Sequence, residues 1–457
     1  MTDLFYFTLG GAGILITLLF GFILVIVSPY RAFLLSIFLS VALSVKTLGY
    51  TRIEDVGAWF NLADALFIIT IFAFIMERKR KLVIPAPPLV LIAVLILGLL
   101  TSMASIGLSY GAIRLFRQAI HMPILFFLTA NMVQDEDRVK SLLLTLVIGA
   151  AIAELAHLGM VFSTGFGGGG ADMEETRVAY VTWSNSYVWP LAGYYIAARG
   201  LIPRRRLQLA LGVIILAANI SVQVRSLALG FLGAAIAYYG WFLKGPYSFK
   251  GERFKGMLKL FVVVLGLLFI VGLGGMIRGY GDRFTQTFDK KQTLTQRGLS
   301  SRTVVLETHF KDWLQGNPLI GRGLGYFDRR GSGSRGLVDF DTMTYIVYLS
   351  QIGLIGFFVY AIWYPLIVLL RARRLLQIPA FSPAVYYLAA LTGACFLMDA
   401  FTFLFSASYF QRAVIPGVLA GAVWGISATQ AKALLQQVPL VQDDQADEIS
   451  KTPMAAG

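Results

Sequence analysis

The amino-acid sequence predicts an all-α polytopic membrane protein with about 12–13 transmembrane helices. Of its 457 residues, 57% are hydrophobic and only 14% are charged, whereas soluble domains carry roughly 25% charged residues. Apolar runs of about the 20 residues that a bilayer-spanning helix needs recur along most of the chain. The single cysteine, Cys395, lies inside such a run, which excludes disulfides and cysteine metal sites.

The net charge of +14 does not indicate a nucleic-acid partner, because the basic residues stand between apolar runs rather than on one soluble surface. Phospholipid headgroups are the expected contacts of most of these cations. The first run has no positively charged flank and no small-residue cleavage site, so it is predicted to be a retained span rather than a signal peptide. The predicted spans are residues 5–27, 32–45, 62–76, 89–105, 119–132, 141–162, 187–198, 207–222, 226–243, 260–277, 344–370, 384–404 and 415–428.

Orientation follows from the basic loops, because short cytoplasmic loops collect lysine and arginine. If the spans alternate, the basic clusters at 78–81, 204–206, 244–259 and 371–374 fall on one side of the membrane. This places the amino terminus outside and the acidic tail, 443–448, in the cytoplasm.

Two predicted outer loops are longer than ordinary connectors. Loop 163–186 contains the glycines 167–170, which lack the following Lys-Ser or Lys-Thr of a phosphate-binding loop and indicate a hinge. Its acidic residues, Asp172, Glu174 and Glu175, are interpreted as a solvated surface rather than a metal site. Loop 278–343 has eight arginines and three lysines, and loops of this length are usually functional.

An amphipathic helix is predicted inside the large loop, from about Ser300 to Gln315. Ser300 and Ser301 can cap it, and the Gly316-Asn317-Pro318 sequence ends it. Its apolar residues recur at helical spacing, so we expect it to lie on the outer leaflet. A guanidinium there can grip phosphate oxygens with two parallel hydrogen bonds, which the point charge of lysine cannot do.

Three pieces of the chain form a recognisable pattern. They are Ser301, Arg302, Trp313 and 317–327 in the large loop, Tyr345, Ile346, Leu349, Gln351 and 353–356 in the following span, and 224–230 in a short outer turn. Together they resemble the O-antigen ligase and polymerase family. The resemblance covers roughly residues 207–370, and it is most specific in the stretch 317–327. Localisation in a bacterial inner membrane is expected from this resemblance.

The resemblance implies a membrane-embedded, GT-C-like glycosyltransferase on the outer face of the inner membrane. Such enzymes move a glycan from a polyprenyl-diphosphate carrier to an acceptor glycan or lipid-linked glycan, without a metal or other cofactor. Catalysis then needs cations to stabilise the departing diphosphate and a base for the attacking hydroxyl. We expect Arg225, Arg302, Arg322 and Arg329 to bind the diphosphate.

The sequence departs from the family at the expected base. Ligases usually carry a histidine just before the span that begins at Thr344, but Thr342 and Met343 stand at the corresponding positions. The three histidines are His121, His157 and His309. The nearest proton acceptors are Asp339 and Asp341, of which Asp341 is the preferred catalytic residue; an ion pair with a loop arginine is the structural alternative.

The missing histidine favours an O-antigen or exopolysaccharide polymerase, with ligation of O-antigen to the lipid A core as the alternative. Other polysaccharide-assembly proteins are candidate partners. A transporter or a flippase for lipid-linked glycans is an alternative from another class, because Glu154, His157 and Asp399 lie in predicted spans. No repeated halves, which are common in transporters, are visible.

The predicted organisation has four parts. Residues 1–206 are amino-terminal transmembrane helices, and residues 207–370 are the ligase- and polymerase-like core with the periplasmic loop 278–343. Residues 371–428 are carboxy-terminal transmembrane helices, followed by a cytoplasmic tail, 429–457.

Overall fold

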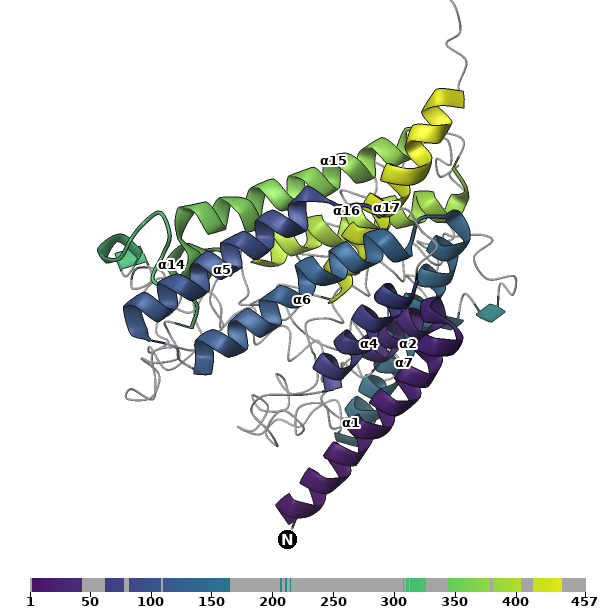
Figure 1. Cartoon of the computed structure of the whole chain (residues 1–457), viewed down its shortest axis with the longest axis horizontal. Coiled ribbons are helices and arrows are strands. Elements are labelled where there is room, and N and C mark those ends of the chain that lie inside the picture. The colour runs from purple at the N-terminus through teal and green to yellow at the C-terminus, as the bar shows by residue number, and fades with distance from the viewer. Residues whose placement is uncertain are drawn as a thin grey trace, which may run out of the picture.

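The computed structural model shows a bundle of long helices (Figure 1). It describes residues 2–42, 62–77, 82–107, 110–164, 206–207, 210–211, 214, 307, 310–311, 313–325, 344–378, 381–403 and 414–437. These residues form no strand, and their main elements are α1 (Thr2–Val27), α2 (Pro29–Ala42), α4 (Leu62–Met76), α5 (Ala86–Ile106), α6 (Tyr110–Met132), α7 (Glu136–Thr164), α14 (Thr344–Phe357), the π-helix η3 (Phe358–Trp363), α15 (Tyr364–Leu376), α16 (Pro383–Phe403) and α17 (Val414–Gln437).

Within the described ranges, four helices are long and apolar enough to cross a membrane, judged by length and composition. They are Ala86–Ser105, Glu136–Ala156, Tyr348–Leu376 and Pro383–Ala400. Shorter apolar helices lie at Leu15–Val27, Pro29–Ala42, Asp64–Met76 and Val414–Gln430. The predicted all-α architecture with membrane-spanning helices is therefore supported.

The observed helices match several predicted spans closely. Helix α4 has the predicted bounds, Leu62–Met76, and α16 differs from its predicted range by one residue at each end. Helix α6, by contrast, begins at Tyr110, nine residues before the predicted start at Ala119. The predicted spans 187–198, 226–243 and 260–277 lie outside the described residues, as does 207–222 apart from four positions.

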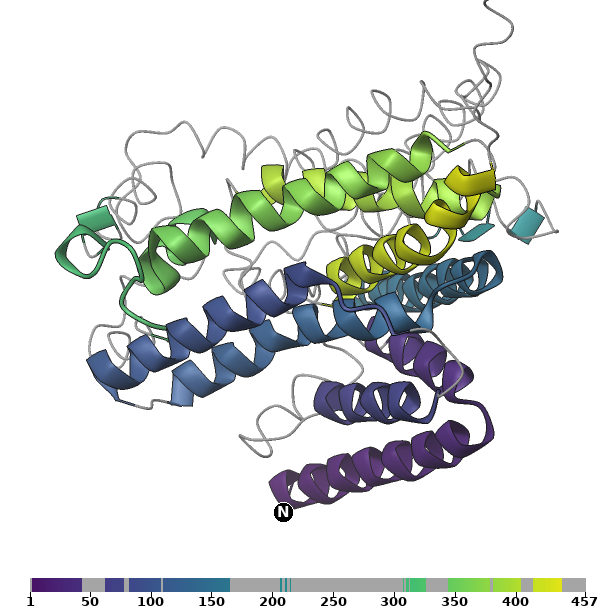
Figure 2. The same ribbon diagram turned by 45° about the horizontal axis from the view of Figure 1, so that its top comes forward.

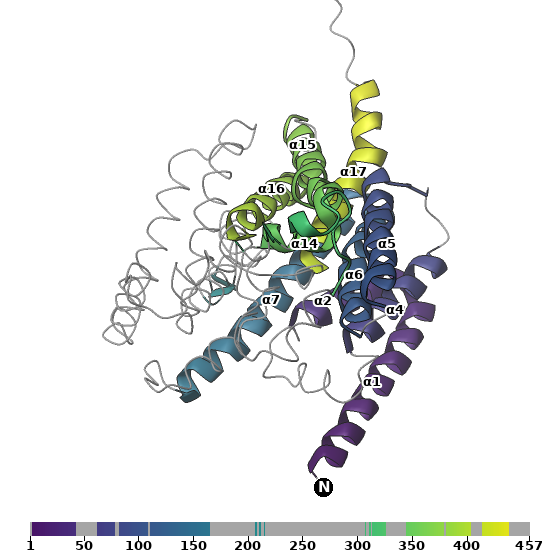
Figure 3. The same cartoon turned by 90° about the vertical axis from the view of Figure 1, so that its left-hand side faces the viewer.

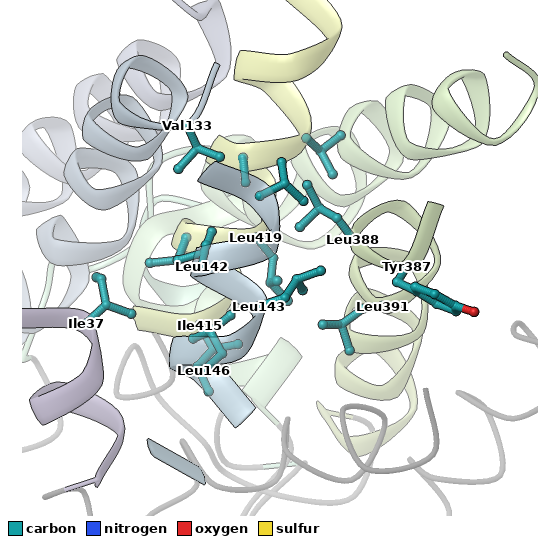
Figure 4. Packing of buried hydrophobic residues seen from close by; sticks show 14 of the residues in the cluster. Ile37, Val133, Leu142, Leu143, Leu146, Tyr387, Leu388, Leu391, Ile415 and Leu419 are labelled. Carbon is teal, nitrogen blue, oxygen red and sulfur yellow. The ribbon is translucent and has the colours of Figure 1, made fainter. Parts of the chain in front are cut away.

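The helices form two groups that meet at α6 and α17. Seen along the long axis, α1, α2 and α4 lie together, and α15 and α16 lie on the other side of α6 and α17 (Figure 3). The axes of α5, α6 and α15 are roughly parallel, with α5 antiparallel to α6 (Figure 2). The larger hydrophobic core joins the groups, with Leu142, Leu143 and Leu146 of α7 facing Leu388 and Leu391 of α16 and Ile415 and Leu419 of α17 (Figure 4).

Helices α6 and α17 pack at close range because α17 presents glycine at every fourth position. A methyl group at Gly417 would lie 2.6 Å from the carbonyl oxygen of Met122. The same substitution at Gly421 or Gly425 would overlap the carbonyl oxygen of Phe126 or Val133. Small residues spaced in this way allow membrane helices to approach backbone to backbone, so α17 lies parallel to α6 along most of its length.

One end of the bundle, which we call the basic end, is where α4, α6 and α15 finish and α7 and α16 begin. Arg138 of α7 forms an ion pair with Glu77 after α4 (Nη2–Oε1 2.8 Å), and Glu136 accepts a hydrogen bond from the Ser382 amide (3.3 Å). Arg371 of α15 lies 3.5 Å above the ring of Trp424 in α17. The basic cluster 371–374 therefore lies at the same end as Glu77, which directly precedes the cluster 78–81, as the alternating spans predict.

Candidate functional site

A glycine-rich turn, residues 316–325, lies at the end of the bundle opposite the basic end, beside α14 (Figure 1); we call it the arginine turn because it holds Arg322. The predicted amphipathic helix precedes it, since the described positions between 307 and 315 are helical and the helix ends at Gly316. The amide N–H of Gly321 donates to the carbonyl of Asn317 (2.7 Å). The indole Nε1 of Trp313 donates to the carbonyl of Pro318 (2.9 Å), which ties the helix to the turn.

The arginine turn docks on a break in helix α14, where Gly353 has φ 66° and ψ −170°. In an unbroken helix the carbonyls of Ser350 and Gln351 would accept from the amides of residues 354 and 355. Instead they accept from Arg322 (3.0 Å) and Gly323 (2.9 Å). The released amides of Leu354 and Ile355 donate to Pro318 (2.9 Å) and Leu319 (3.1 Å).

This exchange matters because backbone groups inside a membrane must find partners within the protein. The turn satisfies four groups that the break releases, and the break supplies partners for the turn. We call this contact between the arginine turn and the break in α14 the junction. Neither the turn nor the break keeps these hydrogen bonds without the other. The single predicted span 344–370 is therefore corrected to a broken helix, α14, followed by η3 and α15.

Three glycines allow the two backbones to approach this closely. Gly321 and Gly323 have φ of 75° and 98°, in the region that side chains rarely adopt. A methyl group at Gly321 would lie 2.5 Å from the carbonyl oxygen of Gln351, and one at Gly323 would overlap the backbone of Ser102. A methyl group at Gly353 would overlap the carbonyl oxygen of Leu319.

Helix α5 forms the other wall of the site. The side chain of Leu324 is fully buried, and its amide N–H donates to the carbonyl of Gly98 (3.2 Å). The hydroxyl of Ser102 donates to the carbonyl of Leu324 (2.8 Å), and that of Ser105 donates to the carbonyl of Arg322 (2.7 Å). Ser102 and Ser105 occupy the last turn of the membrane-spanning stretch Ala86–Ser105, so the arginine turn lies where this span ends.

Arg322 joins this junction through both its backbone groups, and its side chain is half-buried. The stem of that side chain lies across Gly316, because a methyl group at Gly316 would be 2.8 Å from Cγ and 2.9 Å from Nε of Arg322. A guanidinium on a fixed backbone loses little freedom when it binds an anion, which favours binding. The arrangement can hold a phosphate-bearing group at the end of a membrane span.

The helix before the turn presents apolar side chains outward. Phe310 and Leu314 are 48% and 54% exposed, and the Phe310 and Trp313 rings are 5.2 Å apart. Glu307 and Lys311 form an exposed ion pair (2.6 Å), and the hydrogen bond from Lys311 holds the pKa of Glu307 below its usual range. Exposed apolar and charged side chains on one short helix are typical of a membrane-surface helix; its position on the outer leaflet stays a prediction.

Arg322 is the one predicted site residue that lies within the described part of the chain. Arg225, Arg302 and Arg329, predicted to bind diphosphate, lie outside the described residues, as do the predicted bases Asp339 and Asp341. The acidic loop residues 172–175 also lie outside them. Among the residues that the structure describes, no group of three or more His, Cys, Asp or Glu side chains could hold a metal ion.

An ionic cluster between α4 and α6 was missed by the sequence analysis. Asp64 is buried (7% exposed) and pairs with Arg117 Nη1 (3.3 Å) and with His121 Nε2 (3.5 Å). The His121 ring also packs on Phe67, with 4.5 Å between ring centroids. The late start predicted for this span, at Ala119, explains the omission, because it placed Arg117 outside the membrane.

The predicted intramembrane candidates Glu154 and Asp399 are both buried, at 2% and 8% exposure. His157 lies on α7, one turn after Glu154, but its side chain is outside the described set. The transport role considered for these residues stays a prediction. Cys395 is buried in α16.

Compared with models of known protein families and with curated protein sequences, the chain matches none. The similarity of the arginine-rich loop to the O-antigen ligase and polymerase family therefore stays a prediction from the residues that carry it.

Proposed function

We propose that this protein is a glycosyltransferase of surface-polysaccharide assembly that uses a polyprenyl-diphosphate-linked glycan as donor. The proposal rests on the position of Arg322. This residue is held on a rigid glycine turn between α5 and the break in α14, where the span Ala86–Ser105 ends. A lipid-linked diphosphate is presented at this depth. The acceptor is a glycan or a second lipid-linked glycan.

The proposed reaction needs no cofactor. The donor carries its own leaving group, so the protein must stabilise negative charge on the departing diphosphate. The rigid fork of an arginine suits this task. Arg225, Arg302 and Arg329 are proposed to complete the diphosphate site, and Asp341 or Asp339 to act as base; no metal or other cofactor is part of the proposal.

We further propose that the fold is GT-C-like and that the arginine turn faces the outside of a bacterial inner membrane. The basic cluster 371–374 lies at the other end of the bundle, and cationic ends of membrane proteins usually face the cytoplasm. Polymerisation of O-antigen or exopolysaccharide repeat units is the preferred activity. Ligation to the lipid A core is the alternative.

Replacement of Arg322 tests the proposal. We expect Arg322→Ala to reduce glycan transfer by about 100-fold or more, as loss of one positioned charge-stabilising donor does in other enzymes, and Arg322→Lys to restore only part of it. The first measurement is the growth of glycan chains when the purified protein is supplied with lipid-linked repeat units. The second is a gel analysis of surface polysaccharides from a deletion strain complemented with each variant.

Arg373→Ala is the matched control, because it removes an exposed cation from the last turn of α15 at the basic end. Its activity should stay near that of the wild type. Full activity of a correctly folded Arg322→Ala variant would contradict the proposed site. In the deletion strain, loss of long polysaccharide chains with single repeat units retained on the lipid core would indicate a polymerase. Loss of all glycan transfer to the core would indicate a ligase.

The ionic cluster of Asp64, Arg117 and His121 favours the second candidate function, a transporter or flippase of lipid-linked glycans. Ionisable groups inside a membrane bundle commonly mark transport pathways. Vesicles containing the purified protein separate the two functions. New glycosidic bonds indicate the enzyme, whereas translocation of units without bond formation indicates the flippase.

A further inference from the structure

Arg371 lies inside the membrane-spanning stretch that finishes at the basic end of the bundle. It is five residues before the end of α15, which closes the apolar stretch Tyr348–Leu376, or about 7.5 Å along the helix axis. On the neighbouring helix α17, Trp424 lies five residues before Thr429, whose hydroxyl donates to the carbonyl of Gln134 just beyond the end of α6 (3.0 Å). Both helices therefore place the contact between Arg371 and Trp424 more than one helical turn inside the basic end.

The guanidinium of Arg371 is held by an aromatic ring rather than by an acid. Its Cζ atom lies 3.5 Å from the centroid of the Trp424 ring. That ring is itself fixed edge-on against Phe126 of α6, with 5.7 Å between centroids. Stacking on a ring orients the guanidinium plane and leaves the N–H groups in that plane available to an acceptor. The contact fixes the cation without neutralising it.

Within the described part of the chain, Arg371 has no acidic partner. Its Nη1 atom is buried without a hydrogen-bond partner, and no ion pair joins its guanidinium to a described carboxylate. Helices α15 and α17 contain no Asp or Glu over Tyr364–Leu376 and Val414–Gln437. Arg371 is nevertheless only half-buried, so a group from the membrane can approach it.

The acidic side chains described at the basic end bond to other groups. Glu77 and Asp135 pair with Arg138 (2.8 and 3.8 Å), and Glu136 accepts a hydrogen bond from a backbone amide (3.3 Å). A cation at membrane depth is costly unless it is paired. An anion from outside the bundle would therefore stabilise Arg371.

The exposed face of α15 fits a lipid rather than a soluble anion. Leu366, Leu370 and Arg374 are four residues apart, so they share one face of the helix, and all three side chains are exposed. Arg374 also follows Arg371 by one turn, so a phosphate beside Arg371 lies next to a second cation. Apolar side chains below two cations match an acyl chain below an anionic headgroup, whereas a soluble anion would contact the cations alone.

We propose that Arg371, Arg374 and Trp424 form a binding site for an acidic phospholipid in the leaflet at the basic end. The lipid phosphate accepts hydrogen bonds from the Arg371 guanidinium beside Arg374, and an acyl chain follows Leu366 and Leu370. A headgroup with a net negative charge is preferred over a zwitterionic one, because it balances two cations that have no carboxylate on their own helix. The site is independent of the proposed function, since it lies at the end of the bundle opposite the arginine turn.

Lipid titrations of the full-length protein in detergent test the site. We expect native mass spectrometry to detect bound phosphatidylglycerol at lower lipid concentrations than phosphatidylcholine. Arg371→Gln should weaken phosphatidylglycerol binding by about tenfold or more, as the loss of a charged hydrogen bond does. Lys140→Gln is the matched control, because it removes an exposed cation from α7 at the same end, and it should bind like the wild type.

Two further variants keep the test valid if Arg371→Gln does not fold. Arg371→Lys retains the charge but loses the planar fork, so its affinity should lie between those of the wild type and Arg371→Gln. Arg374→Gln changes an exposed side chain and should weaken phosphatidylglycerol binding by about two- to fivefold. Saturating phosphatidylglycerol should also raise the unfolding temperature of the wild type more than that of Arg371→Gln, because a ligand that binds the folded state stabilises it.

Three outcomes would contradict the lipid site. The first is equal affinity of the wild type for phosphatidylglycerol and phosphatidylcholine, which would remove the preference for an acidic headgroup. The second is unchanged phosphatidylglycerol affinity in both Arg371→Lys and Arg374→Gln. The third is complete displacement of phosphatidylglycerol by inorganic phosphate, which would assign the two arginines to a soluble anion.

Discussion

The two ends of the bundle are joined in opposite ways. At the basic end, side chains make the connections. Arg138 pairs with Glu77, donates to the carbonyl of Met132 (2.9 Å) and lies 4.1 Å from the Tyr30 ring centroid. At the other end, the arginine turn, α14 and α5 are joined mainly through backbone groups at glycine positions.

The two ends should differ in how well they tolerate the loss or addition of a side chain. A side-chain junction can lose one side chain and keep contacts made by others, such as the hydrogen bond between Glu136 and the Ser382 amide. A backbone junction depends on close approach, and one added methyl group separates several hydrogen bonds at once. The backbone junction suits a binding site, since it fixes Arg322 through both its amide and its carbonyl.

Gly353→Ala should have the largest effect. The substitution places a side chain at φ 66° and against the carbonyl of Leu319, so we expect a loss of stability of about 2–5 kcal/mol from backbone strain and overlap together. Transfer activity should fall with it, because the four exchanged hydrogen bonds are shared with the arginine turn. Thermal unfolding in detergent and glycan transfer measure the two effects.

Gly107→Ala is the matched control, because Gly107 has a similar φ of 76° but nothing within 4 Å of the added methyl group. It should cost only about 1–2 kcal/mol. Equal losses in the two variants would mean that backbone strain alone, and not the close junction, sets the sensitivity of this end.

Arg138→Ala tests the basic end. It removes an ion pair, a backbone hydrogen bond and a ring contact, all partly exposed, so we expect a loss of roughly 1–3 kcal/mol. Glycan transfer by the protein that remains folded should be unchanged. Lys140→Ala, which removes an exposed cation from the same helix, should change neither quantity; transfer lost in Arg138→Ala at full stability would show that the ends are not independent.

The fold was predictable where apolar residues decide the structure, as in α4 and α16. It was not predictable where polar residues are satisfied across the bundle. Hydropathy started the fifth span at Ala119, after Arg117, yet α6 begins at Tyr110, because Asp64 on another helix pairs with that arginine. A composition window cannot detect a partner that lies more than fifty residues away.

The candidate site was predictable only in part for a similar reason. The sequence placed a turn at Gly316-Asn317-Pro318 and singled out Arg322, and the structure confirms the turn. The break at Gly353 could not be foreseen, because a glycine inside an apolar run is compatible with an unbroken helix. The contact between Ser102 and Leu324 joins residues 222 positions apart, which no local pattern reveals.

Two serines on α5 give the smallest predicted effects and show whether burial controls the junction. Ser102 is fully buried and bonds the carbonyl of Leu324 (2.8 Å), whereas the bond from Ser105 to the carbonyl of Arg322 (2.7 Å) is exposed. Ser102→Ala leaves a buried carbonyl without its partner, so we expect a loss of about 1–2 kcal/mol in thermal unfolding. Ser105→Ala should cost below about 0.5 kcal/mol, since water or a lipid headgroup can replace the hydroxyl. A larger loss from Ser105→Ala than from Ser102→Ala would mean that the Arg322 carbonyl, rather than the buried Leu324, fixes the arginine turn on α5.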